Sequence, residues 1–276
     1  MKRVGLIFAA VLAFWGGALF AAVNAMNGVA VSSSSTILGK TPNSAVMGQT
    51  LASGSSGLLT GLTAYYQFEE TSGNAADSTA NALNLTLNGT LSSTTGKIGN
   101  ARAYDANTAN FFSITSNSFR PGSASFSCTF WVYANTLSQS SFPGLVGMRT
   151  ASNFEWWALW HHSSSTLRSG ISSNGTNETD AIWGSGLSAT TWYLMAVVWD
   201  GANIKTSVNG GAFVSTAFTG PVFGGTAPFI VGKRADGGSA WDGIIDELAF
   251  WNGRALTLTD IGLIYNSGSG LPYSSW

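Results

Sequence analysis

Carboxylates are the residues of this chain whose spacing first suggests chemistry. Glu69 and Glu70 are adjacent, and Asp246 and Glu247 form a second adjacent pair near the C-terminus. Neighbouring residues of a strand point to opposite faces. Glycoside hydrolysis needs two carboxyls facing one bond at roughly 5–10 Å, so neither pair can supply its acid and base. The triplet Glu-x-Asp-x-x-Glu, which would place acids on one strand face, is absent. We therefore predict that the protein is not an enzyme.

The segment around Asp246 predicts a strand with an acid in its apolar face. Strict alternation over residues 243–251 puts Ile244, Asp246, Leu248 and Phe250 on one face, and Ile245, Glu247, Ala249 and Trp251 on the other. A carboxylate among core-facing aliphatic side chains is costly unless it accepts hydrogen bonds or binds a metal ion. Two interpretations remain open for Asp246: a ligand of calcium, or an acceptor of backbone N–H groups that pins a loop.

Aromatic residues supply the second candidate chemistry. Alternation places Phe154, Trp156, Ala158 and Trp160 on one face of a strand, and Glu155, Trp157, Leu159 and His161 on the other. One face must pack on the core, and exposed tryptophans beside polar groups on the other are typical of a sugar-binding surface. The predicted ligand-binding residues are Trp156, Trp157, His161 and Trp183. His161 and His162 are adjacent and diverge, so they predict no metal site.

Composition limits the classes of partner. The 276 residues carry a net charge of −1, and only 9% are charged. This predicts no nucleic-acid partner and no binding to an anionic membrane surface. A hydrophobic content of 45% is enough for a sizeable core. Cys128 is the single cysteine, so no intrachain disulfide forms, and its place among aromatics predicts a buried small residue.

The first 60 residues differ from the rest of the chain. Lys2 and Arg3 precede an apolar run that ends in small residues, which predicts a signal peptide over residues 1–25. An uncleaved N-terminal anchor is the alternative, and only then would the membrane be a partner. Either way we expect a secreted protein or one at the extracellular surface. Residues 26–60 lack aromatics and predict a Ser/Thr/Gly-rich linker or stalk, with a short assembly segment as the alternative.

Residues 61–276 must then form the domain that positions these side chains. Many short apolar segments are separated by turn residues about every 8–12 positions, which is typical of an antiparallel β-sandwich or jelly roll. Residues 256–265 are the good helix candidate, with Thr257 or Thr259 as its cap. We predict an all-β jelly roll with one short C-terminal helix.

Five segments in order resemble the laminin-G-like, concanavalin A-like jelly-roll family. They are Gly61-Leu-Thr-Ala-Tyr-Tyr-Gln-Phe with Asp77-Ser, Gly96-Lys-Ile-Gly-Asn-Ala-Arg-Ala-Tyr-Asp, Phe126-Ser-Cys-Thr-Phe-Trp-Val, Trp192-Tyr-Leu-Met-Ala-Val-Val-Trp-Asp-Gly, and Trp241-Asp-Gly-Ile-Ile-Asp-Glu. The resemblance implies a structural calcium ion, Ca2+, with Asp77, Asn81 and Asp246 as ligands. Ala80 stands where the family usually has glycine, which weakens that site.

The resemblance also sets the expected function. It implies an exported, non-catalytic binding module that recognises carbohydrate or a cell-surface glycoprotein. The alternative is a structural or assembly protein of a cell-surface or virion appendage without a specific small ligand. Exposed Trp156 or Trp157 in a groove would favour binding, and a flat polar surface would favour assembly.

Overall fold

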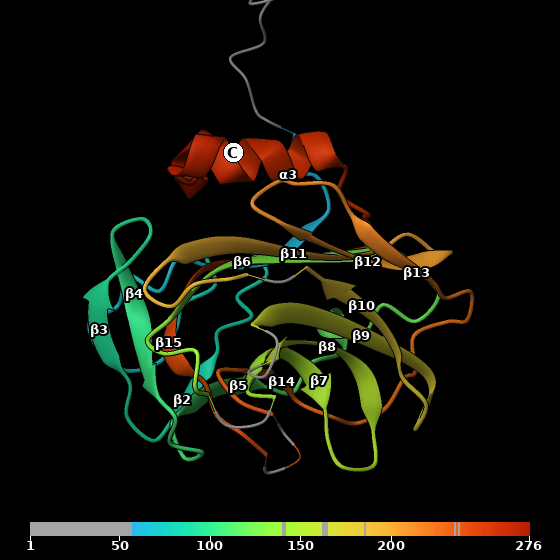
Figure 1. Cartoon of the computed structure of the whole chain (residues 1–276), viewed down its shortest axis with the longest axis horizontal. Helices are drawn as coiled ribbons and strands as arrows, with labels where there is room; N and C mark the ends of the chain where they lie inside the picture. The colour runs from blue at the N-terminus through green and yellow to red at the C-terminus, as the bar shows by residue number, and fades with distance from the viewer. Residues whose placement is uncertain (1–56, 140–141, 162–164, 185, 235, 237) are drawn as a thin grey trace, which may run out of the picture. The chain divides into compact units, whose positions relative to one another are not determined.

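The computed structural model describes residues 57–139, 142–161, 165–184, 186–234, 236 and 238–276 (Figure 1). The predicted signal peptide over residues 1–25, nearly all of the linker predicted over 26–60, and His162 lie outside the described residues. None of the described helices has the length and apolar character needed to cross a membrane.

Two antiparallel sheets make up the described domain (Figure 1). The first has the order β13 (Val214–Ala217), β12 (Asn203–Val208), β11 (Trp192–Trp199), β6 (Phe126–Ala134), β15 (Asp242–Asn252), β4 (Asn100–Asp105) and β3 (Ser92–Thr95), with β1 (Leu62–Tyr66) also paired to β15. The second has the order β10 (Thr179–Trp183), β9 (Thr166–Gly175), β8 (Phe154–His161), β7 (Gly144–Arg149), β14 (Phe229–Val231), β5 (Phe111–Ile114) and β2 (Thr86–Asn88). The predicted antiparallel jelly-roll sandwich is confirmed.

Aromatic and aliphatic side chains from both sheets form the main core. Trp156 from the second sheet stacks on Phe250 from the first, with ring centroids 5.2 Å apart. Cys128 is fully buried in this core, as predicted, and burial raises the pKa of its thiol. Because apolar burial is the main stabilising contribution in such a domain, this core fixes how the two sheets face each other.

A second apolar cluster lies on the outer face of the first sheet. The helix α3 (Leu258–Tyr265) covers it (Figure 1) and buries Ile261 and Ile264. Thr257 caps the helix: its hydroxyl accepts from the backbone N–H of Asp260, whose carboxylate accepts from the N–H of Thr257. This reciprocal capping box gives hydrogen-bond partners to two backbone N–H groups that the helix itself leaves unpaired. It confirms the predicted helix. Short 3₁₀ turns at Asn117–Phe119, Asn266–Gly268 and Tyr273–Ser275 complete the described helices.

The closing strand β15 departs from the predicted alternation. A bulge interrupts its pairing between Asp246 and Ala249, and Glu247 has a φ of 51°. The bulge shifts the pattern by one residue, so Leu248 and Phe250 share the inter-sheet core with Ile245. Asp246 pairs in register with Trp131, whose ring belongs to the outer cluster. The prediction that Asp246 shares a face with Leu248 and Phe250 was therefore wrong.

Candidate functional site

Trp156 lies in the core of the sandwich. It is 0% exposed, and its ring packs against Phe126, Phe229 and Phe250. Its indole N–H donates to the carbonyl of Phe119 at 2.9 Å. No face of the ring is open to a ligand, so the expectation that Trp156 contacts sugar is corrected: it is a packing residue.

Trp157 lies on the opposite, outer face of the second sheet. Its ring lies over Gly170 of β9, because a Cβ at that glycine would come within 2.2 Å of the ring carbon Cζ2. The indole N–H donates to Oε1 of Glu178 at 3.0 Å, and the guanidinium of Arg168 lies 5.8 Å from the ring centroid. Trp157 is 3% exposed. Its ring is therefore a buried packing surface on the outer face of the sheet, and it is not exposed enough for a sugar to stack on it.

The other two predicted ligand residues do not join Trp157. Trp183 ends the edge strand β10, where it is partly buried and packs against the inter-sheet core. His161 ends β8, where its backbone pairs with Thr166. The side chain of His161 lies outside the described residues.

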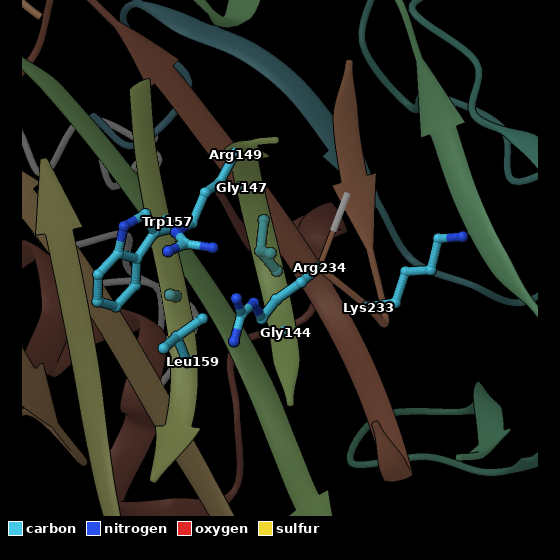
Figure 2. Close-up of a pocket in the computed structure, with 9 residues that line it drawn as sticks. Gly144, Gly147, Arg149, Trp157, Leu159, Lys233 and Arg234 are labelled. Carbon is cyan, nitrogen blue, oxygen red and sulfur yellow. The ribbon is translucent and has the colours of Figure 1, made fainter. Parts of the chain in front are cut away.

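A cleft with a volume of about 220 Å³ opens above Trp157. Its lining residues are Phe142, Arg149, Trp157, Leu159, Arg168, Glu178 and Arg234. A narrower pocket shares Arg149, Trp157, Leu159 and Arg234 with it, and Figure 2 shows that these side chains extend from neighbouring strands and the loop after β14. We call the larger cavity the Trp157 cleft. Arg149 and Arg168 lie on sheet strands, which are rigid supports for a binding site, and Arg234 lies in the loop after β14.

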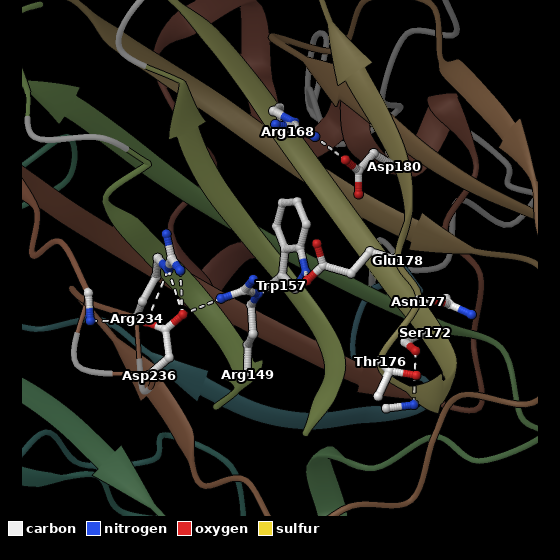
Figure 3. Close-up of polar contacts among 12 residues, drawn as sticks. Arg149, Trp157, Arg168, Ser172, Thr176, Asn177, Glu178, Asp180, Arg234 and Asp236 are labelled. Atoms are coloured by element: carbon white, nitrogen blue, oxygen red, sulfur yellow. Dashed lines mark hydrogen bonds and ion pairs between the residues drawn. The ribbon is translucent and has the colours of Figure 1, made fainter. Parts of the chain in front are cut away.

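Ion pairs hold these arginines in place (Figure 3). Arg149 Nε donates to Glu178 Oε1 at 2.7 Å, and Arg149 Nη1 pairs with Asp236. Arg234 Nε donates to both carboxylate oxygens of the same Asp236 at 3.1 Å. On the other side of Trp157, Arg168 pairs with Asp180. Guanidinium forks with several donors fix the geometry of carboxylate partners, so the network presents a preorganised polar surface.

Two of the acids that pair with these arginines, Asp180 and Asp236, have pKa values shifted in opposite directions. Burial alone would raise the pKa of Asp236, but hydrogen bonds and charge from Arg234 bring it below its usual value. At Asp180 burial is the larger effect and raises the pKa despite the ion pair with Arg168. Asp236 is thus held firmly as a carboxylate, whereas Asp180 takes up a proton more readily as the pH falls.

Sequence reasoning identified Trp157 and missed the charged residues around it. The signal that could have found some of them is spacing: Glu178 and Asp180 are two residues apart, as are Arg234 and Asp236. Residues two apart in extended chain point to the same face. No local pattern, however, could join positions as distant in the sequence as Arg149 and Asp236.

Asp77, the first predicted calcium ligand, has its oxygens occupied by hydrogen-bond donors. Oδ1 accepts from the backbone N–H groups of Tyr65 and Thr79 at 3.0 and 2.9 Å. Oδ2 accepts from the hydroxyl of Thr79 and the N–H of Leu83 at 2.8 and 2.9 Å. Asn81 donates its side-chain N–H to the carbonyl of Thr63. These contacts pin the loop after β1 without a cation.

Asp246, the other predicted acidic calcium ligand, also accepts hydrogen bonds from backbone N–H groups. Its Oδ2 accepts from the backbone N–H groups of Lys97 and Ile98 at 2.7 and 3.1 Å, and Oδ1 accepts from that of Glu247 at 2.9 Å. Burial raises the pKa of Asp246 to about 7, although these bonds act in the opposite direction. Donors converging on a carboxylate occupy the positions that a cation would take. In the described part of the chain, no group of three acidic, His or Cys side chains could hold a metal ion. Asp77, Asn81 and Asp246 therefore do not fit a shared calcium site.

Removal of calcium is expected to leave the stability of the protein unchanged. Because N–H groups of the chain already satisfy Asp77 and Asp246, no carboxylate is left unpaired when EDTA is added. The melting temperature, measured by tryptophan fluorescence in calcium-depleted buffer, should agree with that in millimolar calcium. A rise in the melting temperature with calcium would restore the ligand interpretation.

The fold and the Trp157 cleft define a β-sandwich of the lectin-like class with a polar cavity on one sheet. The family model described as the concanavalin A-like lectin/glucanases superfamily, of laminin G type, matches residues 105–262. This is more than half of the chain, and the chain belongs to this family. No curated protein matches.

Solved structures show the same fold at low sequence identity. The binding domain of Paraclostridial Mosquitocidal Protein 1 is 15% identical, with a TM-score of 0.62 over 76% of this chain and 52% of that one. Domain 4 of AbnA, an extracellular arabinanase from Geobacillus stearothermophilus solved with arabinotriose, is 22% identical, with a TM-score of 0.51 over 73% of this chain and 96% of that one. The binding domain of Botulinum Neurotoxin DC in complex with SialylT is 12% identical, with a TM-score of 0.60 over 75% and 51%. The chain spans about half the length of the two toxin domains.

Proposed function

We propose that this protein is a non-catalytic binding module that recognises carbohydrate, free or on a cell-surface glycoprotein, through the Trp157 cleft. The observation that carries the proposal is the cleft itself: arginines that carboxylates hold in place line a cavity beside the buried ring of Trp157. Sugar rings combine apolar C–H faces with dense hydroxyl groups, which suits a site of this composition. The signal peptide predicted over residues 1–25 would export the domain to where such glycans occur.

Two structural neighbours support this proposal by the molecules with which they were solved. The arabinanase domain was solved with arabinotriose, and the neurotoxin binding domain with SialylT and also with rat synaptotagmin II. Their identities are low, so they favour a class of partner rather than a particular glycan. They are also binding domains rather than catalytic ones, which favours a non-enzymatic role here.

Glycoside hydrolysis is the second candidate, because Glu178 and Asp180 lie two residues apart beside the cleft. Two residues of extended strand span about 6–7 Å, within the roughly 5–10 Å that paired catalytic carboxyls require. The raised pKa of Asp180 is also suited to a general acid. Against this role, Arg168 and Arg149 already occupy the two carboxylates. Release of reducing ends from a bound glycan by the wild-type protein, and its loss in Glu178→Gln, would favour the hydrolase.

Substitution of Arg234 tests the binding proposal with little disturbance of the fold. Arg234→Ala removes a lining donor, while Asp236 keeps its ion pair with Arg149. The full-length chain is first screened on a glycan array, and the affinity for the best glycan is then measured by calorimetry. We expect Arg234→Ala to weaken binding about tenfold, the effect of losing a moderately important contact residue.

Arg254→Ala is the matched control. Arg254 also pairs with an aspartate, Asp260, and its side chain is 23% exposed against 21% for Arg234, but it lies beside α3. The control should bind as the wild type does. Binding that is insensitive to Arg234→Ala would contradict the proposed site. Retention of no glycan by the wild type would instead favour the structural or assembly role.

A further inference from the structure

The ion pairs beside the cleft balance one another in charge. Three arginines, Arg149, Arg168 and Arg234, are matched by three acids, Glu178, Asp180 and Asp236. We propose that the Trp157 cleft selects an uncharged sugar residue and discriminates against acidic ones. This inference rests on the proposed carbohydrate-binding function and specifies the substrate class of that site.

The pairing of each arginine is the first step of the argument. Recognition of a carboxylate or sulfate draws on a guanidinium whose charge is not already neutralised. Arg149 faces two acids, and Arg234 donates to one of them, Asp236, through both Nε and Nη2. An acidic ligand would have to displace one of these carboxylates and leave it unpaired at a partly buried position, which is costly. Glu178, itself part of the lining, would repel an anion directly.

The hydrogen-bonding groups of the lining suit hydroxyls. A guanidinium has five N–H donors, more than the ion pair between Arg168 Nη2 and Asp180 uses. A neutral hydroxyl oxygen can accept from a remaining donor at the cleft surface without disturbing that pair. Hydroxyls also donate, and the carboxylate of Glu178 can accept from them at the same cleft. Paired donors and acceptors of this kind match sugar hydroxyls better than they match an anion.

The size of the cavity points in the same direction. At about 220 Å³ the cleft is smaller than typical small-molecule pockets of roughly 300–1,000 Å³. A cavity of this size holds about one sugar ring, such as the end of a chain, and Glu178 belongs to its lining. The neutral arabinotriose of the arabinanase domain is thus a closer guide to the ligand than the sialylated glycan of the neurotoxin domain.

Paired probes test the selection. The full-length protein is applied to an array that carries each oligosaccharide with and without a terminal acidic residue. We expect retention of uncharged members only, and an affinity that hardly changes between about 0.1 and 1 M salt, which shortens the Debye length from about 10 to 3 Å. Asp236→Asn should raise the ratio of acidic to neutral binding about tenfold, because Arg149 and Arg234 then lose a shared counter-charge.

Asp200→Asn serves as the matched control. Asp200 pairs with Lys205 in the first sheet, away from the cleft lining, so its substitution should leave the ratio unchanged. Wild-type binding of acidic glycans that is lost in Arg234→Ala would overturn the inference and leave the proposed binding function intact. An unchanged ratio in a folded Asp236→Asn variant would also overturn it. Failure of every glycan to bind would instead refute the proposed function.

Discussion

Replacing Trp156 by alanine is expected to destabilise the domain by about 3–5 kcal/mol, the usual cost of deleting a buried tryptophan. Its ring is 0% exposed and contacts three phenylalanines that join the two sheets. The substitution also strands the carbonyl of Phe119, which loses its indole donor. Against a total stability of roughly 5–15 kcal/mol, this loss would leave a marginal fold. Urea denaturation followed by tryptophan fluorescence measures the effect.

Two further variants separate the causes of this loss. Trp156→Phe keeps an aromatic ring but removes the N–H, so it should cost less than Trp156→Ala. Trp183→Ala removes a tryptophan that is only partly buried, so it should cost well under half as much. If Trp156→Ala were no more damaging than Trp183→Ala, the assignment of Trp156 to the core would be refuted.

Replacing Glu247 by glutamine is expected to stabilise the protein at pH 8 and to have little effect near pH 4. Glu247 is 4% exposed, and its Oε2 has no hydrogen-bond partner among the described residues. Burial raises the pKa of this carboxyl from 4.5 to about 8. Desolvation without a partner disfavours the charged form, so the folded protein holds this proton more tightly than the unfolded chain does.

The direction of the pH dependence follows from linkage. Below pH 4.5 the carboxyl is protonated in both states and costs nothing. Between 4.5 and about 8, each pH unit lowers stability by about 1.4 kcal/mol, because only the unfolded state releases the proton. Glutamine removes this loss, and we expect a gain of about 2–4 kcal/mol at pH 8. Asp246, whose pKa is raised to about 7, adds a similar dependence that should persist in the variant.

Chemical denaturation of both proteins at pH 4 and at pH 8 measures this difference. The wild type should be more stable at the lower pH, and the curves of the two proteins should converge there. An equal stability difference at both pH values would show that packing, rather than ionisation, explains the effect of Glu247→Gln.

The jelly-roll fold class and the two faces of β8 around its tryptophans could be predicted from the sequence. Alternation correctly separates Trp156 and Trp160, which lie in the core, from Trp157 on the outer face. Periodicity works here because the pleat of a strand is a local property of the backbone. Alternation did not indicate the environment of Glu155, which is fully buried and pairs with Arg120 at 3.1 Å. A register shift between Phe154 and Trp156 interrupts the alternation there.

Bulges and long-range contacts account for what the sequence could not predict. At β15 the extra residue moves Asp246 out of the inter-sheet core to a loop that donates N–H groups to it. A bulge depends on how two paired strands fit together, so one strand's pattern does not reveal it. The surroundings of the predicted calcium ligands could not be predicted for a related reason: the backbone donors around Asp77 and Asp246 are brought there only by folding.

The sequence by itself determined the antiparallel jelly roll, its family, its capped C-terminal helix and the outward position of Trp157, because each depends on short-range pattern or ordered motifs. Only the tertiary structure brought together the residues of the proposed site. The Trp157 cleft combines Arg149 of β7, Arg168 of β9, Glu178 before β10 and Arg234 after β14. Strand pairing places these distant residues on one sheet face, where opposite charges form ion pairs. No local sequence pattern indicates which residues will pair.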